Sequence, residues 1–122
     1  MNPTHKLIAA AYTAFNARDI DAVLVLMQPD VDWPNGMEGG RVHGHQAVRD
    51  YWTRQWKLVD PNVIPVSMTD DAQDRTTVDV HQVVKDLSGK LLLDQIVQHI
   101  YTVQNDLIAR MDIHEPAHRP AQ

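Results

Sequence analysis

The sequence predicts an α+β domain in which three N-terminal helices pack on a curved, mainly antiparallel sheet of four to six strands. Three observations support this fold class. The chain shows helical periodicity up to Pro61, apolar and polar residues alternate in extended runs after it, and turn-forming clusters separate those runs. A strongly curved sheet wrapped over a helix encloses a conical hollow, so we expect a cone-shaped α+β barrel with its functional site inside.

The helical half is divided by capping residues and prolines. Thr4 and Asp19 are residue types that accept hydrogen bonds from the first backbone N–H groups of a helix. Pro29 and Pro61 end the periodic runs that precede them. The expected elements are a helix from Thr4 to about Ala17, a helix from Asp19 to before Pro29, an extended segment at 31–33, a glycine-rich loop at 35–44 that forms a mobile rim, and a helix from His45 to before Pro61.

The second half is typical of a four-stranded meander. Asn105-Asp106 suits a primed hairpin turn, because both residues tolerate positive φ. Residues 86–89 are typical of a type I turn followed by a glycine bulge. The expected strands span 63–70, 75–86, 90–103 and 107–114.

Length and composition indicate one domain, at 1–116, followed by a flexible tail at 117–122. A net charge of −5 and scattered basic residues argue against nucleic acid or an anionic membrane as the partner. The absence of cysteine excludes thiolate chemistry and fits a cytoplasmic protein. A chain this small favours a homodimer, which we expect to form through the outer face of the sheet at Ile96, Gln98 and Ile100.

The last hairpin suggests a catalytic pair. If the residues that flank its turn pair with each other, opposite residue numbers sum to 211, and His99 lies across from Asp112. Cross-strand Cβ atoms are about 4.5–5.5 Å apart, so an imidazole and a carboxylate would form a general acid/base pair. A surface salt bridge is the alternative. A bulge in either strand would instead turn Met111 and Ile113 inward and separate the pair.

A polar strip beside His99 is a second possibility. The same arithmetic at the preceding turn places His81 opposite Gln95, which would make both of them ligand-binding residues. The opposite alternation of this segment is favoured on hydrophobicity alone, and it turns valines inward instead. These valines are Val78, Val80 and Val84.

Aromatic residues supply the remaining ligand-binding candidates. Trp33 and Trp52 could stack on a flat, polycyclic or aromatic ligand, and Tyr12 and Tyr51 could donate hydrogen bonds to a carbonyl. Tyr101 shares the expected strand face of His99. Core filling is the more common role of tryptophan, and either of the first two tyrosines could point to solvent.

The chain is expected to work without a cofactor or metal. His43 and His45 share one loop but have no third ligand nearby, and zinc needs three or four. The glycines of the same loop match neither a phosphate loop nor a dinucleotide fingerprint. The expected partner is therefore a hydrophobic small molecule.

The order of these elements resembles the nuclear transport factor 2-like superfamily, which includes ketosteroid isomerases and SnoaL-like polyketide cyclases. The run AAYTAFNARDIDAVLVLMQPDVDWPNG, followed by VHGHQAVRDYW, carries a resemblance that extends from about Leu7 to His114. The isomerases keep a catalytic aspartate just before the proline of the first strand, where this chain has Trp33. They keep a tyrosine hydrogen-bond donor in the first helix, where this chain has Ala11 beside Tyr12.

The cyclase branch corresponds better, because it places a histidine on the penultimate strand and an aspartate acid/base on the last, where His99 and Asp112 stand. The limonene epoxide hydrolase type would need an Asp-Arg-Asp set, for which Asp112, Arg110 and Asp94 are present without a spacing that unites them. The resemblance thus implies an isomerase or cyclase that moves a proton next to a carbonyl of a hydrophobic substrate. The alternative is a non-catalytic binding module for a hydrophobic small molecule, which Trp33 at the position of the base favours.

Overall fold

The computed structural model describes residues 2–114, so the predicted tail at 117–122 lies outside the described part. The elements, in chain order, are α1 (Pro3–Asn16), α2 (Ile20–Leu24), β1 (Met27–Pro34), β2 (Arg41–His43), α3 (His45–Trp56), β3 (Val59–Asp70), β4 (Arg75–Asp86), β5 (Leu91–Gln104) and β6 (Leu107–His114). The predicted α+β class is confirmed.

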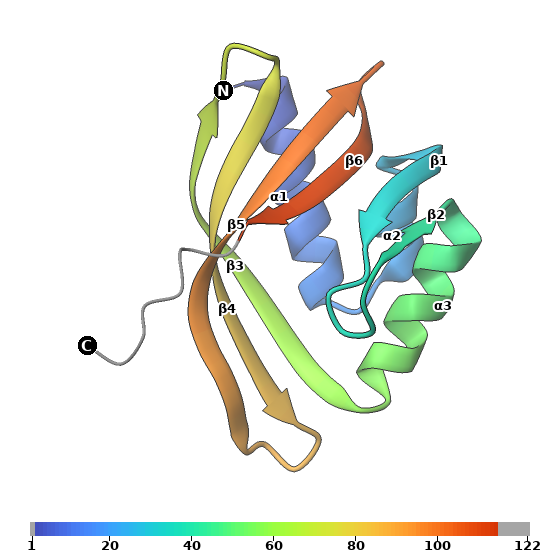
Figure 1. Ribbon diagram of the computed structural model, residues 1–122, viewed down its shortest axis with the longest axis vertical. Helices are drawn as coiled ribbons and strands as arrows, with labels where there is room; N and C mark the ends of the chain where they lie inside the picture. Colours follow the sequence, from blue (N-terminus) through green and yellow to red (C-terminus); the bar gives the residue numbers. More distant parts are fainter. Residues whose placement is uncertain (1, 115–122) are drawn as a thin grey trace.

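The six strands form one curved sheet in the order β2-β1-β6-β5-β4-β3. Neighbouring strands are antiparallel, except for the parallel pair of β1 and β6. Figure 1 shows the sheet wrapping around α1, while α3 lies beside β1 and β2. The sheet stays open, because neither β2 nor β3 has a second neighbour. This arrangement leaves a hollow between the inner face of the sheet and the helices.

Two helix ends differ from the prediction. The cap of α1 is Asn2 and not Thr4, because the Asn2 side chain accepts hydrogen bonds from the Thr4 and His5 backbone N–H groups. Asp19 caps α2 as predicted, but this helix ends at Leu24. It stops early because the chain joins the sheet, where the Leu26 carbonyl accepts a hydrogen bond from the Ile108 N–H.

The sheet is larger than the predicted meander. The strand β3 begins at Val59 and tolerates Pro61 and Pro65, because an edge strand leaves some N–H groups without a ladder partner. The strand β1 is also longer than the predicted segment, and β2 arises inside the predicted glycine-rich loop.

Both predicted hairpin turns are confirmed, but the strands beyond them shift in register. Asn105 and Asp106 both have positive φ, at 53° and 64°, and Gln104 pairs with Leu107. A bulge between Thr102 and Val103 then moves the pairing by one residue, so His99 faces Ile113 and not Asp112. A second irregularity, between Val84 and Lys85, pairs His81 with Ile96 in place of Gln95. A one-residue shift reverses which face a side chain occupies.

The core lies between α1, α3 and the inner face of the sheet. Its fully buried side chains include Ile8, Val31, Val78, Val80 and Ile108. Val78, Val80 and Val84 of β4 therefore point inward, which confirms the second of the two predicted alternations. Over residues 2–114, no helix is long and apolar enough to cross a membrane.

Candidate functional site

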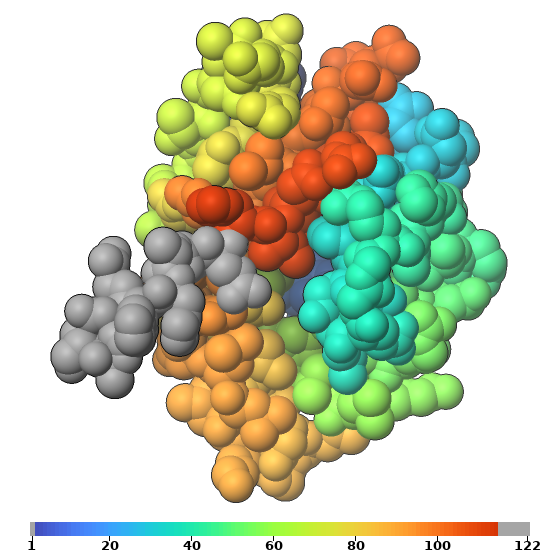
Figure 2. Space-filling model, viewed as in Figure 1, coloured from blue at the N-terminus to red at the C-terminus, as the bar shows by residue number. Residues whose placement is uncertain are grey.

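A cavity of about 330 Å³ opens in the hollow of the cone. Its wall comes from α1, α3, the ends of β1 and β6, and the inner faces of β3 to β5. Figure 2 shows the entrance as a hollow between β6 and the loop at residues 35–40, which we call the rim loop. The polar side chains that line the cavity are Tyr12, Tyr51, Gln55, Gln82, Gln95, His99 and Tyr101.

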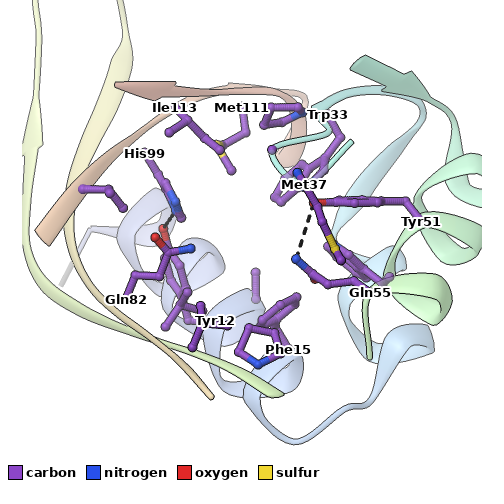
Figure 3. Close-up of a pocket in the computed structure, with 18 of the residues that line it drawn as sticks. Tyr12, Phe15, Trp33, Met37, Tyr51, Gln55, Gln82, His99, Met111 and Ile113 are labelled. Atoms are coloured by element: carbon purple, nitrogen blue, oxygen red, sulfur yellow. Dashed lines mark hydrogen bonds between the residues drawn. The ribbon is translucent and has the colours of Figure 1, made fainter. Parts of the chain in front are cut away.

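The deep end of the cavity holds a hydrogen-bonded pair of His99 and Tyr12. The Tyr12 hydroxyl lies 2.7 Å from His99 Nδ1, and the two rings stack with centroids 5.9 Å apart. His99 is only 7% exposed and Tyr12 only 4%. Figure 3 shows both side chains directed into the cavity. Because Nδ1 is occupied by Tyr12, Nε2 is the ring atom left to meet a ligand.

Burial keeps both members of this pair uncharged. Loss of solvation lowers the pKa of His99 to about 4, so the imidazole is neutral at pH 7. Burial, with a smaller effect of Tyr101, raises the pKa of Tyr12 well above its usual value of 10.0. Burial likewise raises the pKa of Tyr101. The deep end therefore offers hydrogen-bonding groups without a fixed charge.

A second polar group lies on the sheet wall of the cavity, at residues that are less buried than His99. Gln82 on β4 and Gln95 on β5 are direct cross-strand partners on the inner face. Gln95 Nε2 donates to Gln82 Oε1 at 3.0 Å. Gln95 is thus in the cavity as predicted, but beside Gln82 and not beside His81.

The rim loop is tied to α3. The Tyr51 hydroxyl accepts hydrogen bonds from the Met37 backbone N–H, at 3.3 Å, and from Gln55 Nε2, at 3.4 Å. Glu38 receives two hydrogen bonds from the guanidinium of Arg54, at 2.9 and 3.0 Å. These contacts hold Met37 at the cavity wall, as Figure 3 shows.

Aromatic rings from α1, α3 and β1 form another part of the cavity wall. Trp33 and Trp52 both line the cavity and meet edge to face, with centroids 5.7 Å apart. Phe15 packs edge to face on Trp52 at 5.2 Å. Both tryptophans also belong to the buried core. They therefore fill the core, as one of the two predictions has it. Their rings also line the cavity, and stacking on a ligand stays a prediction.

The predicted pairing of His99 with Asp112 is wrong. After the bulge, Asp112 pairs with Ile100 and lies on the outer face of the sheet. Its carboxylate accepts hydrogen bonds from Arg110 and Arg41, and these lower its pKa, with the Arg110 bond as the main cause. Asp32 accepts from the same two arginines, so the four side chains form a charged network across β1, β2 and β6.

Three other histidines that the sequence analysis singled out also lie outside the cavity lining: His81, His43 and His45. His81 is on the outer face, where its Nε2 lies 2.7 Å from Asp94. His43 is exposed and lies near Asp32. His45 bonds the Met27 carbonyl through Nε2. The described residues contain no group of three or more His, Asp or Glu side chains placed to hold a metal ion.

The cavity has no charged wall. Among residues 2–114, the lining includes no Asp, Glu, Lys or Arg. Its titratable groups are His99 and the three tyrosines Tyr12, Tyr51 and Tyr101. Burial raises the pKa of Tyr51 as well, so all four are neutral near pH 7. Such a surface suits an uncharged ligand, because a buried charge without a partner is costly.

Sequence reasoning missed Gln82, Gln55 and Met37 as lining residues. Met111 and Ile113 line the cavity as the predicted alternative with a bulge has them. A signal for Gln82 was available, since period-two alternation places it on the face of the inward valines of β4. A signal for the bulge was available too, because Ile108 and Met111 are apolar and three residues apart. A regular strand cannot turn both of them inward.

Comparisons with known proteins agree with this architecture. No functionally curated protein matches the chain closely enough to count as a relative. TerC, crystallised with polyporic acid, superposes with a TM-score of 0.82 and 26% identity over 94% of this chain and 92% of its own. A proposed polyketide cyclase from Sinorhizobium meliloti superposes with a TM-score of 0.76 and 20% identity, over 93% of this chain and 100% of its own. A Mycobacterium tuberculosis protein in complex with estradiol-17β-hemisuccinate superposes with a TM-score of 0.81 and 17% identity, over 96% of each chain.

These structures share the curved sheet and its helices with the chain, which confirms the predicted nuclear transport factor 2-like fold. The model of the SnoaL-like domain matches residues 8–111, which extend from within α1 to within β6. The chain belongs to the SnoaL-like domain family.

Proposed function

We propose that the protein binds a flat, uncharged ring compound in its cavity, with one oxygen substituent of that compound bound by His99. The observation that carries this proposal is the composition of the lining, which within the described chain combines aromatic and aliphatic side chains with uncharged polar groups. A volume of about 330 Å³ lies at the small end of the range of about 300–1,000 Å³ typical of small-molecule sites.

The direction of hydrogen bonding at His99 fits either a carbonyl or a hydroxyl. When the Tyr12 hydroxyl donates to Nδ1, the proton of the neutral ring is on Nε2, which can donate to a carbonyl. When Nδ1 donates instead, Nε2 can accept from a hydroxyl. Ring faces of Trp33 and Trp52 can pack against a flat frame. The ligands named for the TerC and mycobacterial structures are both built on oxygenated rings, which supports a ring compound. Both of those ligands are acids, whereas the lining of this cavity, within residues 2–114, favours an uncharged compound.

Isothermal titration calorimetry with estradiol tests the proposal, because estradiol is a ring compound without charge near pH 7. We expect saturable binding, and a loss of about fivefold or more in affinity in His99→Leu, since one hydrogen bond disappears. His81→Leu is the matched control, because His81 lies on the outer face of the neighbouring strand. Failure of estradiol to bind the wild type, or equal loss in both variants, would contradict the proposal.

Proton transfer next to a carbonyl is a second candidate function. The contact that favours it is the 2.7 Å hydrogen bond between Tyr12 and His99 Nδ1, which orients the imidazole so that Nε2 can accept a proton. A pKa of about 4 makes His99 a weak base, so this reaction requires an acidic C–H group. Asp112 lies outside the cavity wall and is not needed.

Deuterium exchange tests this reaction. An enolisable ring ketone such as 2-tetralone is incubated with the protein in D₂O, and loss of the α-proton signal is followed by NMR. We expect faster exchange with the wild type and with Asp112→Asn, and the background rate with His99→Leu. Exchange that depends on Asp112 and not on His99 would contradict the assignment.

A further inference from the structure

The inner face of the sheet carries polar groups at two separate levels. The register of β4 and β5 places three residue pairs in succession on this face: Gln82 with Gln95, Val80 with Val97, and Val78 with His99. Neighbouring pairs are two residues apart along the strand. The glutamine pair and the histidine are therefore separated by an apolar level of two valines.

The spacing of these levels follows from strand geometry. His99 follows Gln95 by four positions on the same strand. A strand rises about 3.3 Å per residue, so the two Cα atoms are about 13 Å apart. Both side chains point toward the cavity. Figure 3 shows Gln82 and His99 at different levels of the same wall. The sheet thus holds hydrogen-bonding groups at a fixed interval along the length of a ligand.

The glutamine pair has unused hydrogen-bonding capacity. The bond of 3.0 Å between Gln95 Nε2 and Gln82 Oε1 uses one donor and one acceptor. Each carboxamide provides two N–H donors and one carbonyl, so Gln82 keeps its N–H groups and Gln95 keeps its carbonyl and one N–H. The bond fixes each amide in one orientation. An oxygen substituent of a ligand could be bound there as donor or acceptor.

We propose that Gln82 and Gln95 form a second polar subsite, which selects elongated ring compounds that carry an uncharged oxygen group at each end. One oxygen binds at His99 and the other at the glutamine pair, while the rigid frame crosses the apolar level of Val80 and Val97. This inference rests on the proposed function of the cavity. It adds a requirement for ligand length that the deep end alone does not impose.

A set of three steroids tests the subsite. Estradiol carries a hydroxyl at each end of its frame, and 3-deoxyestradiol and 17-deoxyestradiol each lack one of them. Affinity is measured by quenching of the fluorescence of Trp33 and Trp52, which line the cavity. We expect the wild type to bind estradiol about fivefold more tightly than either analogue, because each analogue loses one hydrogen bond.

The variant Gln82→Met/Gln95→Met keeps side-chain size and removes both amides. We expect its affinity for estradiol to fall to that for one of the two analogues, while affinity for this analogue stays unchanged. Gln98→Met is the matched control, since Gln98 is on the same strand but bonds Asp79 on the outer face. Should the double variant not fold, Gln82→Asn keeps an amide but shortens its reach, and the same loss is expected.

The outcomes separate the two proposals. If the wild type binds all three steroids and the glutamine variants leave their affinity ratios unchanged, the subsite is overturned and the proposed function stands. Equal changes in Gln98→Met would also overturn the subsite. If the wild type binds none of the three steroids, both proposals are overturned.

Discussion

At the scale of single residues, His99 shows what burial does to a titratable group. Its side chain is 7% exposed, and its hydrogen-bond partner, the Tyr12 hydroxyl, is uncharged. A carboxylate partner would have favoured the imidazolium, whereas loss of solvation favours the neutral ring. Because the bulge turns Asp112 to the other face of the sheet, His99 has a neutral partner in place of a carboxylate, and its ring stays uncharged.

The first prediction concerns acid stability. Burial lowers the pKa of His99 to about 4 in the folded protein, against about 6.5 in the unfolded chain. The unfolded state thus binds the extra proton, and the free energy of unfolding falls as pH drops from about 6.5 toward 4. We expect a loss of about 2 kcal/mol between pH 7 and 4.5 from this residue, measured by urea denaturation.

His99→Gln is expected to show a smaller loss over the same range, while the exposed control His81→Gln keeps the wild-type slope. Carboxyl groups with lowered pKa values, such as Asp32 and Asp70, titrate below their ordinary value of 3.8 and so act at lower pH. A wild-type slope in His99→Gln would show that other groups cause the acid sensitivity.

A second prediction concerns Tyr12. In Tyr12→Phe, His99 Nδ1 loses its partner inside the core, which is expected to lower the free energy of unfolding by about 1–2 kcal/mol. Tyr51→Phe is the comparison, because its hydroxyl accepts two longer bonds, at 3.3 and 3.4 Å, and a smaller loss is expected. Thermal and urea unfolding at pH 7 measure both. Equal losses of unfolding free energy in the two variants would show that the bond between Tyr12 and His99 stabilises the protein no more than the longer bonds of Tyr51.

At the scale of elements, the sequence predicted the type and order of the helices and strands better than it predicted which face of the sheet each side chain occupies. Alternation, caps and turn residues predicted three helices, four long strands and both tight turns, since these signals act within a few residues. Which residues face inward beyond a turn depends on a single bulge, such as the one between Thr102 and Val103. His99 was placed correctly in the hollow, whereas Asp112 and His81 were not.

The rim loop is the element whose behaviour we expect to set the rate of ligand entry. Arg54→Met removes the two hydrogen bonds to Glu38 that hold this loop on α3. Because exposed ion pairs add little stability, we expect a change in unfolding free energy of less than about 1 kcal/mol. We also expect faster amide exchange at residues 36–40 and faster association and dissociation of the ligand.

Arg49→Met is the matched control for the rim loop, because Arg49 is also on α3 but pairs with Asp21 of α2. Hydrogen exchange followed by mass spectrometry and stopped-flow fluorescence give the two readouts. Unchanged exchange at the rim loop in Arg54→Met would contradict a restraining role for this ion pair.

At the scale of the whole molecule, the outer face of the sheet carries apolar side chains that the monomer leaves in water. Ile64, His81 and Ile96 form one row across β3, β4 and β5, and the two isoleucines are each 48% exposed. Such a patch can pack face to face against the same patch of a second copy about a two-fold axis, which makes a self-complementary interface. We propose that this face binds a second copy of the chain.

The last prediction tests this assembly. Ile96→Glu replaces an exposed apolar side chain at the β5 end of the row with a charge. Burying this charge in the interface is costly, so we expect the dimer to dissociate. Leu58→Glu is the control, because Leu58 is similarly exposed, at 60%, but lies between α3 and β3, away from this row. Analytical ultracentrifugation over a range of concentrations gives the mass of each variant.

We expect wild type and Leu58→Glu to sediment as dimers and Ile96→Glu as a monomer. The cavity of Ile96→Glu is expected to stay intact, because the cavity is lined from the opposite face of the sheet. A monomeric wild type, or a dimer that survives Ile96→Glu, would place the interface elsewhere or exclude it.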